Sequence, residues 1–413
     1  MKLLHTGDWH LGDRLGRIDR SAELRRAVER IAAYCEQEAI DVLLIAGDIF
    51  SELPRSDGLR ECIAHLQSTF APFFHRGGTI LAVTGNHDNE GFCRTLRHAM
   101  ILAAPSAEDF GTLVLPGRFY LADAPTLLRL PDRATGSAVQ FVLMPYPTPG
   151  AYFSNEVQQR YSNLDERQRF LTAAFTNRLD EIRADARFDA TLPTVLMAHC
   201  NVQGAQAEHL FHLDPKDDIV CPSDVVTENY AYVALGHIHK PHFLGTRTHV
   251  RYCGSLERLD LGEAGDCKGV MVFEIMSSGL AGEPRCLPLE CTPIYEVSIH
   301  DPATEMATLR ERFPDHEQAL VNLKVRFTSG TESLETILRE LDEIFPRWYA
   351  REWSETAELG PAITPGPDAG KAFESVVREY LDGELAHHDE ATRATILNRA
   401  ERLLESLARG DGA

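Results

Sequence analysis

Five short apolar runs constrain the fold of this chain more than any other feature, because polar side chains follow each of them directly. Runs of this length that are rich in leucine, isoleucine, valine and alanine are typical of buried strands. They lie at residues 2–5, 41–46, 79–83, 194–198 and 232–235. Between the first two, Leu24, Val28 and Ile31 recur at helical spacing, and the order strand, helix, strand predicts an α/β layer.

The residues that follow these runs carry oxygen and nitrogen donors. The polar clusters are Asp8-Trp9-His10, Gly47-Asp48, Gly85-Asn86-His87-Asp88, His199 and Gly236-His237-Ile238-His239. Ligand sites in layered α/β folds form at the carboxyl ends of the strands. We therefore expect the five clusters to converge on one site, although they are spread over more than half of the chain.

The types and spacing of these donors predict a site for two metal ions. Asp-x-His and His-x-His place both side chains on the same side of an extended backbone. A mixed oxygen and nitrogen ligand set suits Mn²⁺, Fe²⁺ or Zn²⁺ better than Mg²⁺ or Ca²⁺. The nine cysteines form no Cys-x-x-Cys pair that would indicate a structural zinc site. Two ions ~3.5–4 Å apart would hold a phosphate and activate a water, which predicts phosphoester hydrolysis.

Each cluster taken alone has an ordinary structural interpretation. A single histidine is more often a surface or core residue, Gly-Asp is common in turns, and Asn-His-Asp can cap a loop. The order of all five clusters, each at a predicted strand end, favours the metal site over these alternatives.

The length of 413 residues exceeds what one hydrophobic core supports and predicts two or three domains. We expect the metal-binding domain at residues 1–278 and a small α+β domain at 279–356. A linker rich in proline and glycine follows at 357–371, and two amphipathic helices at 372–413. Two short helices cannot bury both apolar faces alone, so we expect them to dock on this chain or on a partner.

The formal net charge of −21 would repel nucleic acid or an anionic membrane from most of the surface. A metal site or a basic stripe can reverse the potential locally. No stretch reaches the ~18 consecutive apolar residues of a membrane span. The first residues also lack the apolar core of a signal peptide. We expect a cytoplasmic protein with no membrane contact.

Taken together, the five clusters resemble the signature of the calcineurin-like metallophosphoesterase superfamily. Longer segments are similar to the SbcD-like nucleases within it, namely residues 5–12 (HTGDWHLG), 46–50 (AGDIF), 232–239 (YVALGHIH) and 252–257 (YCGSLE). The resemblance is strong over residues 1 to about 275. Beyond them, only the order of the predicted segments is similar to that of the family. It implies an α/β fold: a four-layer metallophosphoesterase β-sandwich flanked by helices, then a small α+β capping domain and C-terminal helices.

The resemblance also implies a role for each residue of the site. The expected ligands of the first metal are Asp8, His10 and His239, and those of the second are Asn86, His199 and His237. Asp48 would bridge both ions. His87 would stabilise the transition state or protonate the leaving oxygen. Asp88 would orient the His87 ring, or cap the loop instead.

Three further residues are candidates for binding DNA. Arg14 and Arg17, with Arg20, form the cationic cluster nearest to the first ligand loop, and a solvated surface is the alternative. His242 replaces a frequent glutamine of the family, and it is either a DNA contact or a surface histidine. Ser51 stands where relatives carry a histidine or an aspartate, so the role of that position in placing a DNA end is open here.

The function implied by the resemblance is that of a manganese-dependent nuclease. We expect a 3′–5′ exonuclease on double-stranded DNA and an endonuclease on single strands or hairpins, acting in DNA repair, recombination and replication. The implied partners are DNA and an SbcC-like ATPase, which the C-terminal helices would bind. A homodimer is implied as well.

Two other functions remain possible from the residues alone. A phosphodiesterase or phosphatase of small substrates would use the same metals. Against a protein phosphatase, Gly47-Asp48 lacks the Asp-Arg-Gly sequel of those enzymes. From a different class, the chain would be a scaffold with a vestigial metal site, although every expected ligand type is present.

Overall fold

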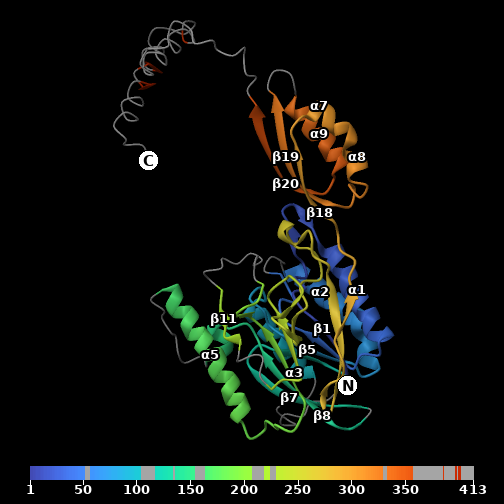
Figure 1. Cartoon of the computed structure of the whole chain (residues 1–413), viewed down its shortest axis with the longest axis vertical. Helices are drawn as coiled ribbons and strands as arrows, with labels where there is room; N and C mark the ends of the chain where they lie inside the picture. The colour runs from blue at the N-terminus through green and yellow to red at the C-terminus, as the bar shows by residue number, and fades with distance from the viewer. Residues whose placement is uncertain are drawn as a thin grey trace. The chain divides into compact units, whose positions relative to one another are not determined.

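The computed structural model describes residues 1–51, 56–103, 117–133, 135–153, 163–206, 218–223, 229–328 and 333–356, and the single residues 385, 396, 397, 399 and 400 (Figure 1). Residues 1–327 and 333–354 form one compact unit. The predicted linker at 357–371 and nearly all of the predicted helices at 372–413 lie outside the described residues, so both stay predictions. No helix in the described ranges is long and apolar enough to cross a membrane.

The first sheet is built on the first three predicted strands, which are confirmed. Its order is β16-β15-β1-β4-β5-β6, and β17 also pairs with β15. The strands are β1 (Lys2–Thr6), β4 (Val42–Ile45), β5 (Thr79–Val83), β6 (Phe119–Ala122), β15 (Gly269–Met276), β16 (Gly279–Leu280) and β17 (Arg285–Pro288). Strands β1, β4, β5 and β6 run parallel. Helix α1 (Ser21–Gln37) lies between β1 and β4 in the chain, and α2 (Ser56–His75) and α3 (Glu90–Ala103) follow β4 and β5.

The second sheet contains the other two predicted strands, in the order β13-β14-β12-β9-β8-β7. Its strands are β7 (Thr126–Pro131), β8 (Ala138–Met144), β9 (Thr194–His199), β12 (Tyr232–Gly236), β13 (His242–Leu244) and β14 (Arg247–Tyr252). Strands β8, β9, β12 and β14 run parallel. Helices α4 (Pro149–Tyr152) and α5 (Leu164–Ala184) lie between β8 and β9 in the sequence. Short pairs are formed by β2 (Arg14–Leu15) with β3 (Ile18–Asp19) and by β10 (Asn201–Val202) with β11 (Val220–Cys221).

Alternation along the strands explains why the apolar runs are continuous. In β4, Leu44 faces the core between the sheets while Leu43 faces the core under the helices. In β9, Met197 joins the core between the sheets and Leu196 the core under α5. In strands that are buried on both faces, the side chains of both faces are apolar, so the sequence does not alternate between apolar and polar residues. Helices, two sheets and helices therefore form the four layers predicted, with α1 and α2 on one side of the sandwich and α5 on the other (Figure 1).

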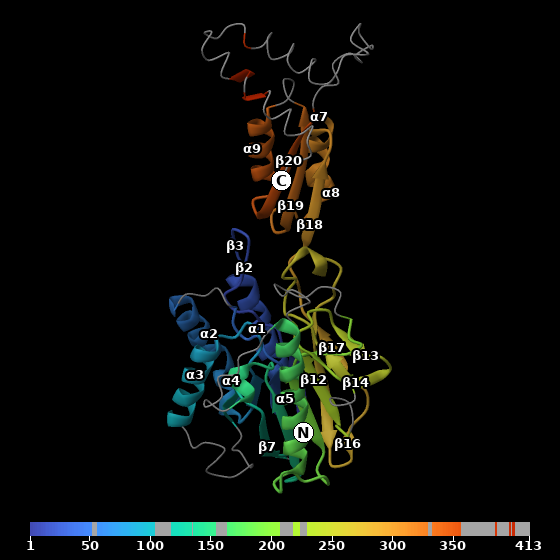
Figure 2. The same cartoon turned by 90° about the vertical axis from the view of Figure 1, so that its left-hand side faces the viewer.

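A small α+β region follows the sandwich and matches the predicted elements. It contains β18 (Ile294–Ile299), α7 (Pro302–Glu305), α8 (Leu309–Arg312), β19 (Leu320–Thr328), α9 (Leu334–Ile344) and β20 (Trp348–Thr356). The three strands lie side by side in the order β18-β19-β20 around a core of their own (Figure 2). Strands β16 and β17 lie beyond residue 278 but pair with β15, so the first sheet continues past the expected boundary. The division into domains stays a prediction.

Candidate metal centre

The structure brings all the expected metal ligands together at the carboxyl ends of β1, β4, β5, β9 and β12. Donor atoms of Asp8, His10 and His239 lie within 4.8 Å of one another, and so do those of Asp8, Asp48 and His199. Every one of these five side chains is buried. The two groups share Asp8, so the donors form one continuous cluster.

The first half of the cluster centres on two facing imidazole nitrogens. His10 Nε2 and His239 Nε2 are 3.1 Å apart, and His10 Nε2 lies 3.7 Å from Asp48 Oδ2. In the second half, Asn86 Oδ1 lies 3.0 Å from His199 Nε2 and 2.9 Å from His237 Nδ1. His199 Nε2 is also 3.3 Å from Asp48 Oδ2. The same carboxylate oxygen of Asp48 thus contacts a histidine of each half, as a bridging ligand would.

The backbone of the ligand loops is held in conformations that ordinary residues rarely adopt. Asp8, His10, Asp48 and His237 have φ angles of 52°, 45°, 49° and 98°. Such left-handed conformations cost about 1–3 kcal/mol each and collect at functional sites. They turn the side chains inward directly after the strands, and this placement is what the cluster requires.

Glycine is needed where these loops approach one another most closely. A Cβ atom on Gly85 would lie 2.0 Å from Asp48 Oδ1. A Cβ atom on Gly47, which has φ of 94°, would lie 2.2 Å from His199 Nδ1. The glycines of the Gly-Asp and Gly-Asn-His-Asp motifs therefore let the metal-binding side chains pack against backbone.

Two carboxylates that the sequence analysis missed orient the histidines from behind. Glu263 Oε1 lies 2.9 Å from His239 Nδ1, and Asp218 Oδ1 lies 2.9 Å from His237 Nε2. Burial acts to raise the pKa of Glu263, but His239 and the buried Lys268 ammonium outweigh it and hold this pKa below its ordinary value. Each carboxylate fixes which ring nitrogen remains for the cluster, namely Nε2 of His239 and Nδ1 of His237. No local spacing in the sequence signals either residue.

Replacing Glu263 with glutamine is expected to weaken metal binding by ~10–100-fold, the usual cost of losing such a carboxylate behind a ligand histidine. Titration of the metal-free protein with Mn²⁺, followed by calorimetry, measures the affinity. Asp266→Asn is the matched control, because Asp266 pairs with the same Lys268, at 3.0 Å, whereas Glu263 contacts both Lys268 and the His239 ring. Equal affinities for both variants would contradict the orienting role of Glu263.

His87 and Asp88 lie beside the cluster in different ways. The backbone N–H of His87 donates to Asp48 Oδ1 at 2.8 Å, and the His87 ring centroid lies 5.1 Å from that of His10. The Asp88 carboxylate accepts backbone N–H groups of Phe50 at 2.9 Å and Gly85 at 2.8 Å. These are the contacts of a loop cap, the second of the two roles expected for Asp88. Burial raises the pKa of Asp88 to about 6, and the nearby Asp48 carboxylate acts in the same direction.

The candidate DNA contacts are engaged with other parts of the protein. Arg17 donates to the carbonyls of Pro346 at 2.8 Å and Trp348 at 3.0 Å, and its guanidinium lies 4.0 Å from the centre of the Trp348 ring. Arg14 pairs with Asp19 at 3.6 Å. The contacts of Arg17 link the β2–β3 hairpin to the small α+β region.

The surroundings of His242 and Ser51 are also clear. His242 Nε2 accepts the backbone N–H of Gln206 at 3.1 Å, and its ring stacks on Tyr252. Ser51 Oγ donates to Asp13 Oδ1 at 3.0 Å. These contacts give His242 a structural role, and DNA binding by Arg14, Arg17 or His242 stays a prediction.

The cluster has the properties of a two-metal site. Among the described residues, Asp8 Oδ2 is a buried carboxylate oxygen that accepts no hydrogen bond. Buried carboxylates need a compensating cation or hydrogen bond, and burial raises the pKa of Asp8. The donors are oxygen and nitrogen with no sulfur, which suits borderline divalent ions. The residues present therefore fit two divalent cations.

Comparisons with known proteins agree with this geometry. A family model described as calcineurin-like phosphoesterase matches residues 1–241. The chain is 27% identical to the SbcD subunit of the nuclease SbcCD from Escherichia coli (strain K12), over 83% of this chain and 82% of that protein. It is 32% identical to the protein of the same name from Rhodobacter capsulatus, over 70% and 69% of the two chains. The Bacillus subtilis (strain 168) protein of that name is 24% identical over 82% of each chain.

Proposed function

The chain belongs to the calcineurin-like phosphoesterase family, and we propose that it is a metal-dependent DNA nuclease that acts with an SbcC-like ATPase. The observation that carries this proposal is the convergence of the buried Asp and His donors and of Asn86 at the strand ends. The similarity of the chain to SbcD nuclease subunits over most of its length supports DNA as the substrate class. A phosphodiester is the bond that a two-metal site of this kind cuts.

We assign Asp8, His10 and His239 to one ion and Asn86, His199 and His237 to the other, with Asp48 between them. Manganese is the ion we propose, because the donor set mixes imidazole with oxygen ligands. Two divalent cations would supply charge stabilisation for the phosphate and activation of a water. The protein contributes the fixed positions of the ligands, which Glu263 and Asp218 hold through the histidine rings.

His87 is the residue we assign to the reacting phosphate. The backbone N–H of His87 donates to Asp48, which holds the residue next to the cluster. This contact does not use the imidazole ring, so the ring can contact the phosphate. An imidazole in this place can donate a proton to the leaving oxygen or a hydrogen bond to the charged transition state. Asp88 supports this by joining the loops after β4 and β5.

The finer activities follow the family. We propose 3′–5′ exonuclease action on double strands and endonuclease action on single strands and hairpins, in repair, recombination and replication of DNA. The small α+β region would cap the DNA. Residues 372–413 would bind the ATPase, and two copies of the chain would pair. An ATPase that contacts phosphates would offset the net charge of −21.

The proposal is tested with the purified protein, a labelled hairpin-ended duplex and bis-p-nitrophenyl phosphate, a small chromogenic phosphodiester. We expect Mn²⁺ to support cutting of the DNA, and excess EDTA to abolish it because the buried carboxylates and imidazoles cannot activate water alone. Restoring Mn²⁺ should restore cutting. Hydrolysis of the small ester without any cutting of DNA, with and without the ATPase, would contradict the nuclease and indicate a small-substrate phosphodiesterase.

A further inference from the structure

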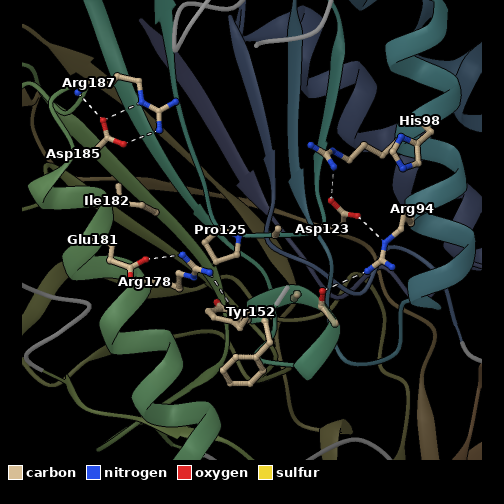
Figure 3. Close-up of a pocket in the computed structure, with 15 residues that line it drawn as sticks. Arg94, His98, Asp123, Pro125, Tyr152, Arg178, Glu181, Ile182, Asp185 and Arg187 are labelled. Atoms are coloured by element: carbon tan, nitrogen blue, oxygen red, sulfur yellow. Dashed lines mark hydrogen bonds and ion pairs between the residues drawn. The ribbon is translucent and has the colours of Figure 1, made fainter. Parts of the chain in front are cut away.

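A pocket of about 640 Å³ lies outside the metal centre, over the edge where the two sheets meet. The turn at residues 123–125 joins β6 of the first sheet to β7 of the second and forms its floor. Helix α3 provides one wall and α5 the other, and α4 lies between them (Figure 3). Seven of the fifteen lining residues are charged, with four arginines against three carboxylates.

The excess positive charge is concentrated on the α3 wall. Arg94 and Arg97, one helical turn apart, both pair with Asp123, at 3.6 and 3.1 Å. Figure 3 shows Arg94 and Asp123 side by side. Two guanidinium groups on one carboxylate leave an excess of one positive charge among the lining side chains, and the Glu90 carboxylate in the first turn of α3 lies close to Gly150 at the edge of the pocket. On the opposite wall, Arg178 pairs with Glu181 and Arg187 pairs with Asp185, so that side is neutral.

The exposure of these groups shows which of them a ligand would meet. The side chains of Arg94 and Arg97 are 42% and 32% exposed, but that of Asp123 is only 11% exposed. The carboxylate therefore lies behind the guanidinium groups and holds them in place. Each guanidinium has five N–H donors, more than one shared carboxylate can use. An anion in the pocket would meet free donors at fixed positions.

Two segments of the chain connect this pocket directly to the metal centre. Helix α3 begins at Glu90, just after His87, and Arg97 lies about 10 Å farther along its axis. The Tyr146 ring lies 5.4 Å from the ring of His237, and Gly150, four residues later, lines the pocket and accepts a hydrogen bond from Arg94 at 3.4 Å. The first two turns of α3 and residues 146–150 are thus the short segments that join the pocket to the metal centre.

The composition of the lining distinguishes between kinds of ligand. Pockets for small molecules are mostly apolar with few polar groups. Arginines that contact the backbone of a nucleic acid strand fix its position and need no apolar enclosure. On a chain with a net charge of −21, the two partly exposed guanidinium groups that share Asp123 are where a phosphate would bind in this pocket.

We propose that Arg94 and Arg97 form a subsite for a phosphodiester group of the DNA strand, a few nucleotides from the bond that is cut. The subsite rests on the nuclease function proposed above and adds a positioning contact to it. Such a contact carries no sequence information, and it sets the register of the strand relative to the metals.

The test uses the full-length protein with Arg97→Gln, and with Arg94→Gln and Arg97→Gln combined. The probe is a fluorescein-labelled single strand of about 12 nucleotides, long enough to reach from the metals to the pocket. Anisotropy gives Kd at several salt concentrations. Loss of a charged hydrogen-bonding partner should weaken binding by roughly ten- to a hundredfold. The slope of log Kd against log salt should fall by ~0.7 for each phosphate of the single strand that the variant no longer binds.

The matched control is Arg25→Gln on α1, because Arg25 is also about one-third exposed, at 37%, and pairs with Glu61 at 3.1 Å. It should leave Kd and the salt slope as in the unaltered protein. Hydrolysis of bis-p-nitrophenyl phosphate reports whether each variant keeps a working metal centre. Cleavage of the strand is compared with it.

The outcomes separate the two proposals. Unaltered protein that cuts the strand, with Arg97→Gln equal to the Arg25→Gln control in Kd and slope, would overturn the subsite alone. Unaltered protein that hydrolyses the small ester but neither binds nor cuts DNA would overturn the nuclease function, and the subsite with it.

Discussion

Asp48→Asn is expected to lower phosphodiester hydrolysis by at least ~10³-fold, because it removes a negative charge shared by both halves of the cluster. This loss exceeds the usual effect of removing one hydrogen-bond donor to the transition state. Asp48 Oδ2 lies 3.7 Å from His10 Nε2 and 3.3 Å from His199 Nε2. Two neighbouring cations repel each other, and a carboxylate between them offsets that repulsion. We therefore expect the variant to bind fewer than two Mn²⁺ ions per chain, as measured by calorimetry and by metal analysis after dialysis.

A suitable control for this change is Glu257→Gln. Glu257 is also buried, but it pairs with Arg20 at 3.1 Å and does not belong to the metal cluster. Its replacement should lower the thermal stability while leaving two Mn²⁺ ions per chain. If Asp48→Asn bound two ions with unaltered affinity, the bridging position assigned to Asp48 would be wrong.

The features that the sequence predicted correctly have signals that are local in the chain. Strands such as β4 and β9 are buried on both faces, so they appear as continuous apolar runs. Parallel pairing places the carboxyl ends of β1 and β4 at one edge of the first sheet and those of β9 and β12 at one edge of the second. Asp8, Asn86 and His237 follow those ends directly, so the order of the motifs was enough to predict that they meet.

The features that the sequence did not predict depend on contacts between distant segments. Glu263 reaches His239 from the short helix after β14, and no spacing rule connects them. The Arg17 guanidinium contacts Trp348, 331 residues away, which no pattern in the sequence indicated, and its role in binding DNA stays a prediction. The charge of the α3 wall depends on Asp123, which β6 places beside Arg94 and Arg97. Packing sets these positions, and periodicity carries no information about them.

His87→Ala is expected to leave both metal ions in place and to lower the turnover of DNA by ~10²–10⁴-fold, the usual contribution of a positioned acid or base. Metal binding should survive because His87 contacts Asp48 through its backbone N–H, which alanine keeps. Mn²⁺ calorimetry and single-turnover cleavage of the labelled hairpin measure the two quantities. His10→Ala, which removes a ring facing His239, is the contrasting variant and should lose metal and activity together.

The leaving group decides which of the two roles His87 has. Cutting DNA releases a basic sugar alkoxide that must take up a proton. Hydrolysis of bis-p-nitrophenyl phosphate releases nitrophenolate, a stable anion that needs none. If His87 is the general acid, His87→Ala should slow the cutting of DNA far more than the hydrolysis of bis-p-nitrophenyl phosphate. If the ring stabilises charge on the phosphate, both substrates should slow by similar factors, because the phosphate is common to them. Turnover of both substrates at the unaltered rate would remove His87 from the reaction altogether.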